Sequence, residues 1–115
     1  MPVEARDQDI LAHILRYCDQ IETAHGDFGH DRERFNQSTT YQNAVSMCIL
    51  QIGELAGHLS DAFKAAHAAI PWHKIRGMRN YVAHEYGSID LDVVWYVATN
   101  SIEDVKRFCK EIIGQ

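Results

Sequence analysis

Residues 7–24, DQDILAHILRYCDQIETA, carry the clearest periodic pattern in the chain. Apolar side chains return there at steps of three and four residues, at Ile10, Leu11, Ile14, Leu15, Cys18 and Ile21. Because an α-helix completes a turn about every 3.6 residues, this spacing places these side chains on one face. The pattern predicts a first amphipathic helix over about residues 7–24, which ends near Gly26.

The same period returns through the rest of the chain. Residues 25–38 are polar and predict a loop anchored by Phe28 and Phe35. Further helices are predicted over about residues 39–59, 61–67, 72–84 and 91–113, the short one opened by Ser60 and the last capped by residues 88–90. The last helix has an apolar stripe at Val94, Val97, Ala98, Ser101, Val105, Phe108 and Ile112. No strand-like alternation is found, so we expect one all-α domain over residues 1–115, an up-and-down bundle of four main helices plus a short helix.

Gly53 and Gly57 lie one turn apart inside the second predicted helix. Glycines at this spacing leave a strip of helix surface without side chains, which lets another backbone approach closely. We therefore expect a close helix crossing at this pair. Glu54, beside Gly53, is expected to be solvated rather than to orient a site.

Composition restricts the classes of protein that remain. The chain has 115 residues, of which 46% are hydrophobic and 23% charged, which is typical of a globular domain. Eleven Lys and Arg against 16 Asp and Glu give a net charge of −5, which argues against non-specific coating of nucleic acid. The chain has no apolar run long enough to span a membrane, and its opening, MPVEARDQDI, lacks the features of a secretory signal. We expect a cytoplasmic protein with no membrane partner.

The three cysteines are Cys18, Cys48 and Cys109, an odd number with no Cys-x-x-Cys pair. Each falls among apolar residues of a different predicted helix, so we expect buried, reduced thiols. Seven histidines are scattered through the chain without a helical His-x-x-x-His pair or a Cys–His zinc spacing. No metal site and no cofactor are expected.

Residues 72–86, WHKIRGMRNYVAHEY, differ from the acidic remainder. They hold Lys74, Arg76 and Arg79 against a single acid, Glu85. A basic segment in an acidic chain concentrates anions locally, so Lys74 and Arg76 are candidate phosphate-binding residues. The alternative is an ordinary solvated helix face.

Helical spacing refines the anion site. In a continuous helix Arg76, Asn80 and His84 follow one another at steps of four along one exposed stripe, and Arg79 lies one residue to the side. Apolar Ile75, Met78 and Val82 would then face the core. A guanidinium binds phosphate oxygens and an imidazole transfers protons near neutral pH, so this set can bind a phosphate and move a proton beside it. Trp72 and Trp95 could offer a surface on which a base stacks, but packing between the third and last helices is the favoured role. The same two roles are open to Tyr81.

The stretch Arg79–Tyr86, RNYVAHEY, resembles the signature of the HEPN superfamily, which has an Arg, a polar residue, three variable positions and a His. The Tyr two residues after the His resembles the HepT branch, the toxin half of HepT–MntA toxin–antitoxin pairs. The resemblance continues, in order, through HILRYCDQIE, YQNAVSMCILQIGELAGHLS, IPWHKIRGMRN and YGSIDLDVVW.

This resemblance implies an all-α homodimer with metal-independent endoribonuclease activity on an RNA substrate. Arg79 and His84 match the catalytic pair, and Asn80 matches the polar motif residue. Tyr86 matches the residue that receives AMP from the MntA nucleotidyltransferase antitoxin, the expected partner. Because one His cannot comfortably act as both base and acid in one step, a second His84 from a two-fold dimer suits the chemistry.

Three hypotheses remain open at this point. The chain is a toxin ribonuclease that works through Arg79 and His84, a non-cutting helical module that presents Tyr86 or a nucleotide to a nucleotidyltransferase, or a structural dimeric bundle. The intact Arg–Asn–His set favours the first, because a presenting module needs no proton-transfer residue. The basic segment argues against the third.

Overall fold

A computed structural model describes residues 3–82 and 90–114, and the chain is helical through most of these ranges, with no strand in either. The helices are α1 (Ala5–Phe28), α2 (Arg32–Gln37), α3 (Thr39–Gly57), α4 (Asp61–Ala66), α5 (Trp72–Gly77), the 3₁₀ turn η1 (Met78–Tyr81), α6 (Leu91–Tyr96), the π-helical turn η2 (Val97–Ser101) and α7 (Ile102–Ile113). Four main helical segments pack as a bundle: α1, α3, α5–η1 and α6–η2–α7. The predicted all-α bundle is confirmed. None of the described helices is long and apolar enough to cross a membrane.

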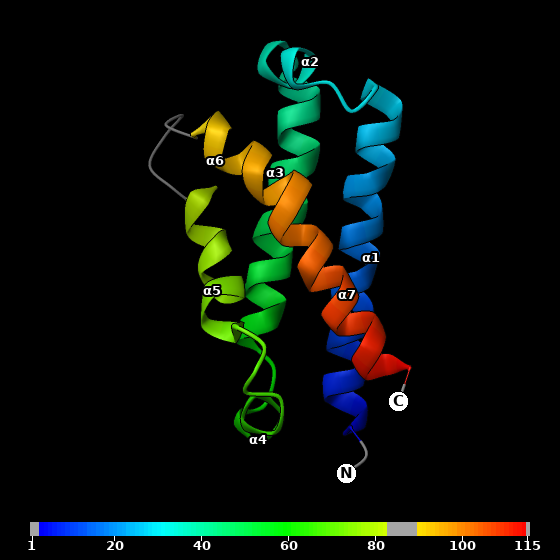
Figure 1. Ribbon diagram of the computed structural model, residues 1–115, viewed down its shortest axis with the longest axis vertical. Coiled ribbons are helices and arrows are strands. Elements are labelled where there is room, and N and C mark those ends of the chain that lie inside the picture. Colours follow the sequence, from blue (N-terminus) through cyan, green and yellow to red (C-terminus); the bar gives the residue numbers. More distant parts are fainter. Residues whose placement is uncertain (1–2, 83–89, 115) are drawn as a thin grey trace.

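The two longest helices, α1 and α3, lie side by side, and the other segments pack around them (Figure 1). The α6–η2–α7 segment crosses this pair diagonally, while α5–η1 lies along α3. The short α4 and the N-terminal end of α1 lie at one end of the bundle, and α2 lies at the other. Buried Asp7 of α1 ties the first end together, since its carboxylate accepts hydrogen bonds from Ser60 N (2.9 Å) and Ser60 Oγ (2.7 Å), at the start of α4.

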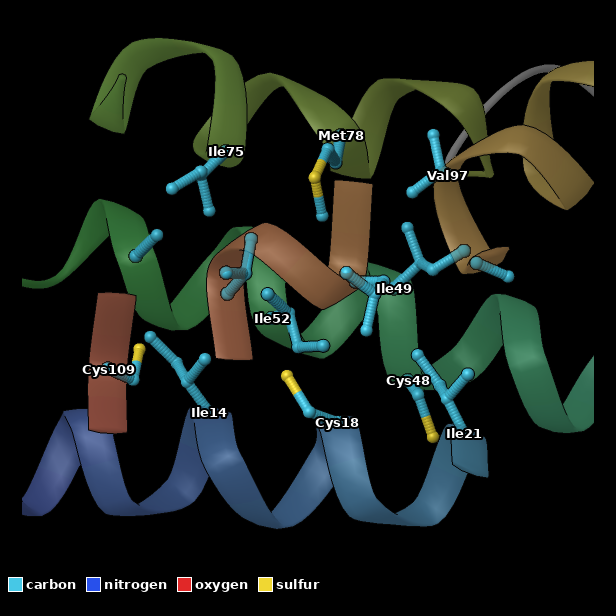
Figure 2. Close-up of a cluster of buried hydrophobic side chains, with 14 of the residues drawn as sticks. Ile14, Cys18, Ile21, Cys48, Ile49, Ile52, Ile75, Met78, Val97 and Cys109 are labelled. Atoms are coloured by element: carbon cyan, nitrogen blue, oxygen red, sulfur yellow. The ribbon is translucent and has the colours of Figure 1, made fainter. Parts of the chain in front are cut away.

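One hydrophobic core fills the space between these helices (Figure 2). Ile14 and Cys18 of α1, Ile52 of α3 and Cys109 of α7 meet there and are almost completely buried. The expectation of buried, reduced cysteines is confirmed, because all three thiols are free and buried. Burial raises the pKa of Cys18 and of Cys109 to about 12, and that of Cys48 to about 11, so these thiols stay neutral in the folded protein.

The first helix runs beyond Gly26, where it was predicted to end, to Phe28. It ends at Gly29, which takes the left-handed backbone conformation (φ 78°) that glycine adopts without strain. The following residues form α2, capped by Asp31, so the predicted loop over residues 25–38 is largely helical. The two phenylalanines do anchor it: Phe35 is fully buried, and Phe28 stacks on Tyr41 with ring centroids 4.6 Å apart.

An aromatic cluster fills the α2 end of the bundle. Trp95 packs there against Phe35 and Tyr41, with centroid distances of 5.2 and 6.2 Å. At the α4 end, Trp72 packs against Phe63 at 5.5 Å. Packing is thus the observed role of both tryptophans, but these aromatic partners of Trp95 belong to α2 and α3 and that of Trp72 to α4, not to the interface between the third and last helices.

Buried His25 on α1 is the polar centre of the aromatic cluster. Its Nδ1 pairs with the Tyr41 hydroxyl, and its Nε2 lies 3.5 Å from the carbonyl oxygen of Ala98 in the π-helical turn η2. Both contacts suit a neutral ring that donates from Nε2 and accepts at Nδ1. Burial lowers the pKa of His25, and nearby His30 lowers it further, against opposing effects of the Ala98 carbonyl, Glu22 and Glu103.

The last helix is the predicted one with its register altered. It runs from Leu91 to Ile113, but its middle is the π turn η2, in which hydrogen bonds span five residues instead of four. Beyond this turn Val105 and Ile112 are buried as predicted, but Ile102 and Cys109 are more deeply buried than Ser101 and Phe108, which the predicted stripe contained. Those two side chains are only partly buried.

Candidate functional site

The close crossing predicted at Gly53 and Gly57 is present. A Cβ atom added to Gly53 would lie 2.9 Å from the backbone nitrogen of Arg79 and 3.0 Å from the carbonyl oxygen of Arg76. At Gly57 it would lie 3.2 Å from Nε of Arg76. The backbone of α5–η1 therefore rests directly on α3, and the two arginines lie over this glycine strip.

The crossing joins Arg79 to Glu54. The Nε atom of Arg79 lies 2.6 Å from Oε1 of Glu54, and the two side chains are 40% and 42% exposed. The Nε atom itself is covered, and its N–H is not aligned on the carboxylate as a hydrogen bond would require. An ion pair this exposed adds little to stability, so its main consequence is to fix where the guanidinium lies.

Glu54 was missed as a site residue, because the sequence alone predicts a solvated side chain there. The signal that could have found it is its position. It neighbours the glycine that permits the crossing, so the segment that crosses must pass beside its carboxylate. The segment that crosses is residues 74–79, which carries Lys74, Arg76 and Arg79 and can therefore supply a cation to that carboxylate.

The third predicted helix, 72–84, is wrong over residues 78–81. Its α-helical part ends at Gly77, and residues 78–81 form a 3₁₀ turn. A 3₁₀ turn advances by about 120° per residue instead of about 100°, so side chains after residue 77 leave the predicted stripe. The three residues predicted to face the core still do so, since Ile75 and Met78 are buried and Val82 is partly buried.

The structure separates the predicted anion-binding residues into two groups. Arg76 and Arg79 lie over α3, whereas Lys74 and Asn80 line a groove on the other side of the segment, against α6–η2–α7. Lys74, Arg76 and Asn80 are exposed. The common stripe predicted for Arg76 and Asn80 is therefore not observed, because the change of helix type falls between them.

His84 and Tyr86 lie outside the described residues, as does Glu85. The predicted pairing of Arg79 with His84 thus stays a prediction. The described part of the motif is Arg79 to Val82, one residue past the end of η1, and the next described residue, Asp90, caps α6. Within residues 3–82 and 90–114, no three His, Cys, Asp or Glu side chains form a cluster that could hold a metal ion.

This arrangement suits the binding of an anion. The segment from Pro71 to Val82 contains three permanent cations and no carboxylate of its own. A guanidinium fixed at one nitrogen by Glu54 and still 40% exposed can offer donors to phosphate oxygens with little loss of rotational freedom.

Comparison with known proteins assigns the class. The family model described as "Ribonuclease HepT-like" matches residues 14–112, and the chain belongs to this family. It is 30% identical over 104 residues, 90% of either chain, to the protein named "Putative RNase TTE0752" of Caldanaerobacter subterraneus subsp. tengcongensis.

Two further relatives carry similar names. The chain is 30% identical over 103 residues to "Putative RNase MJ0125" of Methanocaldococcus jannaschii, over 90% of this chain and 87% of that one. It is 32% identical over 65 residues to "Probable ribonuclease HepT" of Thermococcus cleftensis, over 56% and 59% of the two chains. No solved structure matches the chain. The resemblance to HepT-like proteins noted in the sequence is confirmed.

Proposed function

We propose that this protein is an endoribonuclease that cleaves RNA without a metal ion and serves as the toxin of a toxin–antitoxin pair. The observation that carries the proposal is the position of Arg79. It is the first residue of the Arg–Asn–x₃–His motif, and the glycine crossing and Glu54 hold it in place while it stays partly exposed. Membership of the HepT-like ribonuclease family supports the same function.

The proposed reaction uses a nucleophile that RNA itself supplies. The 2′-hydroxyl loses its proton and attacks the adjacent phosphorus, the bond from phosphorus to the 5′-oxygen breaks, and that oxygen takes up a proton. The products are a 2′,3′-cyclic phosphate and a 5′-hydroxyl. His84 acts as base or acid, and Arg79 stabilises the negative charge that develops on the phosphoryl oxygens.

The other motif residues take supporting roles in this proposal. Asn80 orients the substrate, and Lys74 and Arg76 attract its phosphates. A two-fold homodimer supplies a second His84, so that one imidazole removes a proton while the other donates one.

The first test is expression of the chain beside its His84→Ala variant, with growth and RNA integrity measured together. We expect the parent to arrest growth and degrade RNA, and the variant to do neither. Equal toxicity of the two chains without RNA cleavage would contradict the proposal, and would favour the module that only presents Tyr86 to a partner.

Control by an antitoxin forms the second part of the proposal. A nucleotidyltransferase of the MntA type is proposed to attach AMP to the hydroxyl of Tyr86, two residues after His84. The added phosphate would compete with RNA for Arg79, and the nucleoside would occupy space that the substrate needs.

We expect mass spectrometry after co-expression with the cognate nucleotidyltransferase to place the AMP mass on the peptide that contains Tyr86. The Tyr86→Phe variant should remain folded, active and insensitive to the enzyme. Modification at another residue, or normal neutralisation of Tyr86→Phe, would assign Tyr86 a different role.

A further inference from the structure

A groove runs between the α5–η1 segment and the α6–η2–α7 segment, on the side of α5 that faces away from the glycine crossing. Asn80 of the motif lies in one wall, so the groove begins beside the proposed catalytic site. The wall from α5–η1 carries the polar side chains of His73, Lys74 and Asn80 beside apolar Ile75 and Met78, and the opposite wall is mainly apolar. The lining residues that matter here are Lys74, Asn80, Tyr81, Tyr96, Asp104 and Phe108.

Two exposed aromatic rings face this groove. Among the described residues, the large hydrophobic side chains that are strongly exposed are Met47, Tyr81 and Tyr96, at 54%, 44% and 62%. Both tyrosines line the groove, one from each wall. Large apolar groups that gather at a concave surface mark binding sites more often than solitary ones do.

Local structure explains why Tyr96 is exposed. Trp95 turns into the aromatic cluster, and the next residue of the helix is rotated by about 100° from it. The π turn η2 starts directly after Tyr96, and its Val97 and Ser101 form part of the same wall. π turns are frequently found at functional sites, since they displace side chains from the regular helical register.

The charged residues that line the groove indicate the kind of ligand it binds. The α5–η1 wall brings the cation Lys74, and the only carboxylate in the described lining is Asp104. That carboxylate is paired with Arg107, 3.1 Å away. The surface therefore fits a ligand with both negative charges and flat rings.

We propose that this groove binds single-stranded RNA next to the phosphate that is cleaved. A base stacks on Tyr96, with Tyr81 on the facing wall, and Lys74 contacts the phosphate of the same nucleotide. Unpaired bases are required because only they offer free ring faces for stacking. This inference rests on the proposed ribonuclease function and adds the form of RNA and the place where it lies.

The test measures binding separately from cleavage. A short single-stranded RNA with 2-aminopurine beside the cut site is titrated into the full-length His84→Ala protein, and fluorescence reports both stacking and affinity. We expect Tyr96→Ala in this background to weaken binding about tenfold and to abolish the fluorescence change, as loss of one stacked base does elsewhere. Tyr96→Phe keeps the ring and should bind as tightly as the His84→Ala protein. Met47→Ala, an equally exposed site outside the groove, is the matched control.

A second pair of variants isolates the phosphate contact. Lys74→Gln should lower the slope of log affinity against log salt by about 0.7, the value for one phosphate on a single strand. Lys110→Gln, an exposed lysine of α7 away from the groove, should leave that slope unchanged.

The outcomes separate this inference from the proposed function. If the parent cleaves RNA and Tyr96→Ala binds as tightly as its background, the groove site is wrong and the ribonuclease stands. If the parent neither binds nor cleaves single-stranded RNA, both fail. If Tyr96→Ala converts a dimer to monomers in sedimentation and leaves RNA affinity unchanged, the groove is an interface between copies, which also overturns the inference.

Discussion

Helix α3 packs differently on its two sides. Toward α1, isoleucines and cysteines interlock in the core, and each is fully or almost fully buried (Figure 2). Toward α5–η1, Gly53 and Gly57 present bare backbone, and Arg76 and Arg79 lie across it. Both sides bury apolar residues, Ile75 and Met78 on the second, but only the second also fixes the position of two cations. A change on the first side should therefore cost stability, and a change on the second should cost activity.

The largest effect on stability is expected at Ile52, a residue of α3 whose side chain is fully buried in the core. Ile52→Ala should lower the free energy of unfolding by about 2–5 kcal/mol, through lost burial and the cavity left behind. Chemical denaturation measures this change. At a temperature where the variant is folded, its cleavage rate should match that of the parent, and a large loss of rate per folded molecule would contradict the division between the two sides.

Gly53→Ala tests the other side with a single methyl group. The new Cβ would lie within 3.0 Å of backbone atoms of Arg76 and Arg79, which cannot turn aside as a side chain could. We expect a loss of about 1–3 kcal/mol in unfolding free energy, together with a fall in cleavage of tenfold or more, about the cost of a misplaced catalytic group.

Gly26→Ala is the matched control for this variant. Gly26 lies inside α1 with no atom within 4 Å of an added Cβ. The substitution should raise stability by about 0.5–1 kcal/mol and leave cleavage unchanged. If both glycine variants behaved alike, the crossing would have no special role.

The α1 side includes a buried polar contact between His25 and Tyr41, and it should make stability depend on pH. Since burial lowers the pKa of His25 below its unfolded value of 6.5, the folded state binds fewer protons than the unfolded state as pH falls. The stability contributed by neutral His25 is therefore complete above pH 6.5 and is lost below it. Denaturation midpoints measured from pH 7.5 to 5 should fall for the parent and for His13→Gln, an exposed histidine of α1, and fall less for His25→Gln. An equal slope in His25→Gln would exclude His25 as the cause.

Glu54→Gln is expected to have the smallest effect on stability, within about 0.5 kcal/mol, because its ion pair with Arg79 is half exposed. The cleavage rate should nevertheless fall about tenfold, since the guanidinium loses its fixed position. Glu103→Gln, an exposed carboxylate on α7, is the control for loss of one negative charge. If both variants kept the full rate, Glu54 would have no positioning role.

Much of the fold could be predicted from the sequence because it depends on local periodicity. The helix over residues 7–24 and the close crossing at Gly53 and Gly57 follow from the spacing of apolar residues and glycines, and both are present. The capping roles of Ser60 and Asp90 also follow from residue type and position.

The departures arise where tertiary packing changes the helix type. The 3₁₀ turn at residues 78–81 and the π turn at 97–101 alter the number of residues per turn. The spacing of apolar residues in the sequence predicts neither turn. A stripe drawn with a constant helical angle consequently misplaces Asn80 relative to Arg76, and it buries Ser101 in place of Ile102. Glu54 was missed for a related reason, because its partner lies 25 residues away and meets it only through the crossing.

The most direct measurement of the central claim is the cleavage of single-stranded RNA by the purified chain in excess EDTA, with the product ends identified and Arg79→Ala assayed in parallel. We expect cleavage by the parent that leaves 2′,3′-cyclic phosphate ends, and a rate at least about 100-fold lower for Arg79→Ala. A 2′-deoxy substitution at the cut site should abolish the reaction. Cleavage by Arg79→Ala at the parent's rate, or activity that disappears with EDTA and returns with Mg²⁺, would contradict the account.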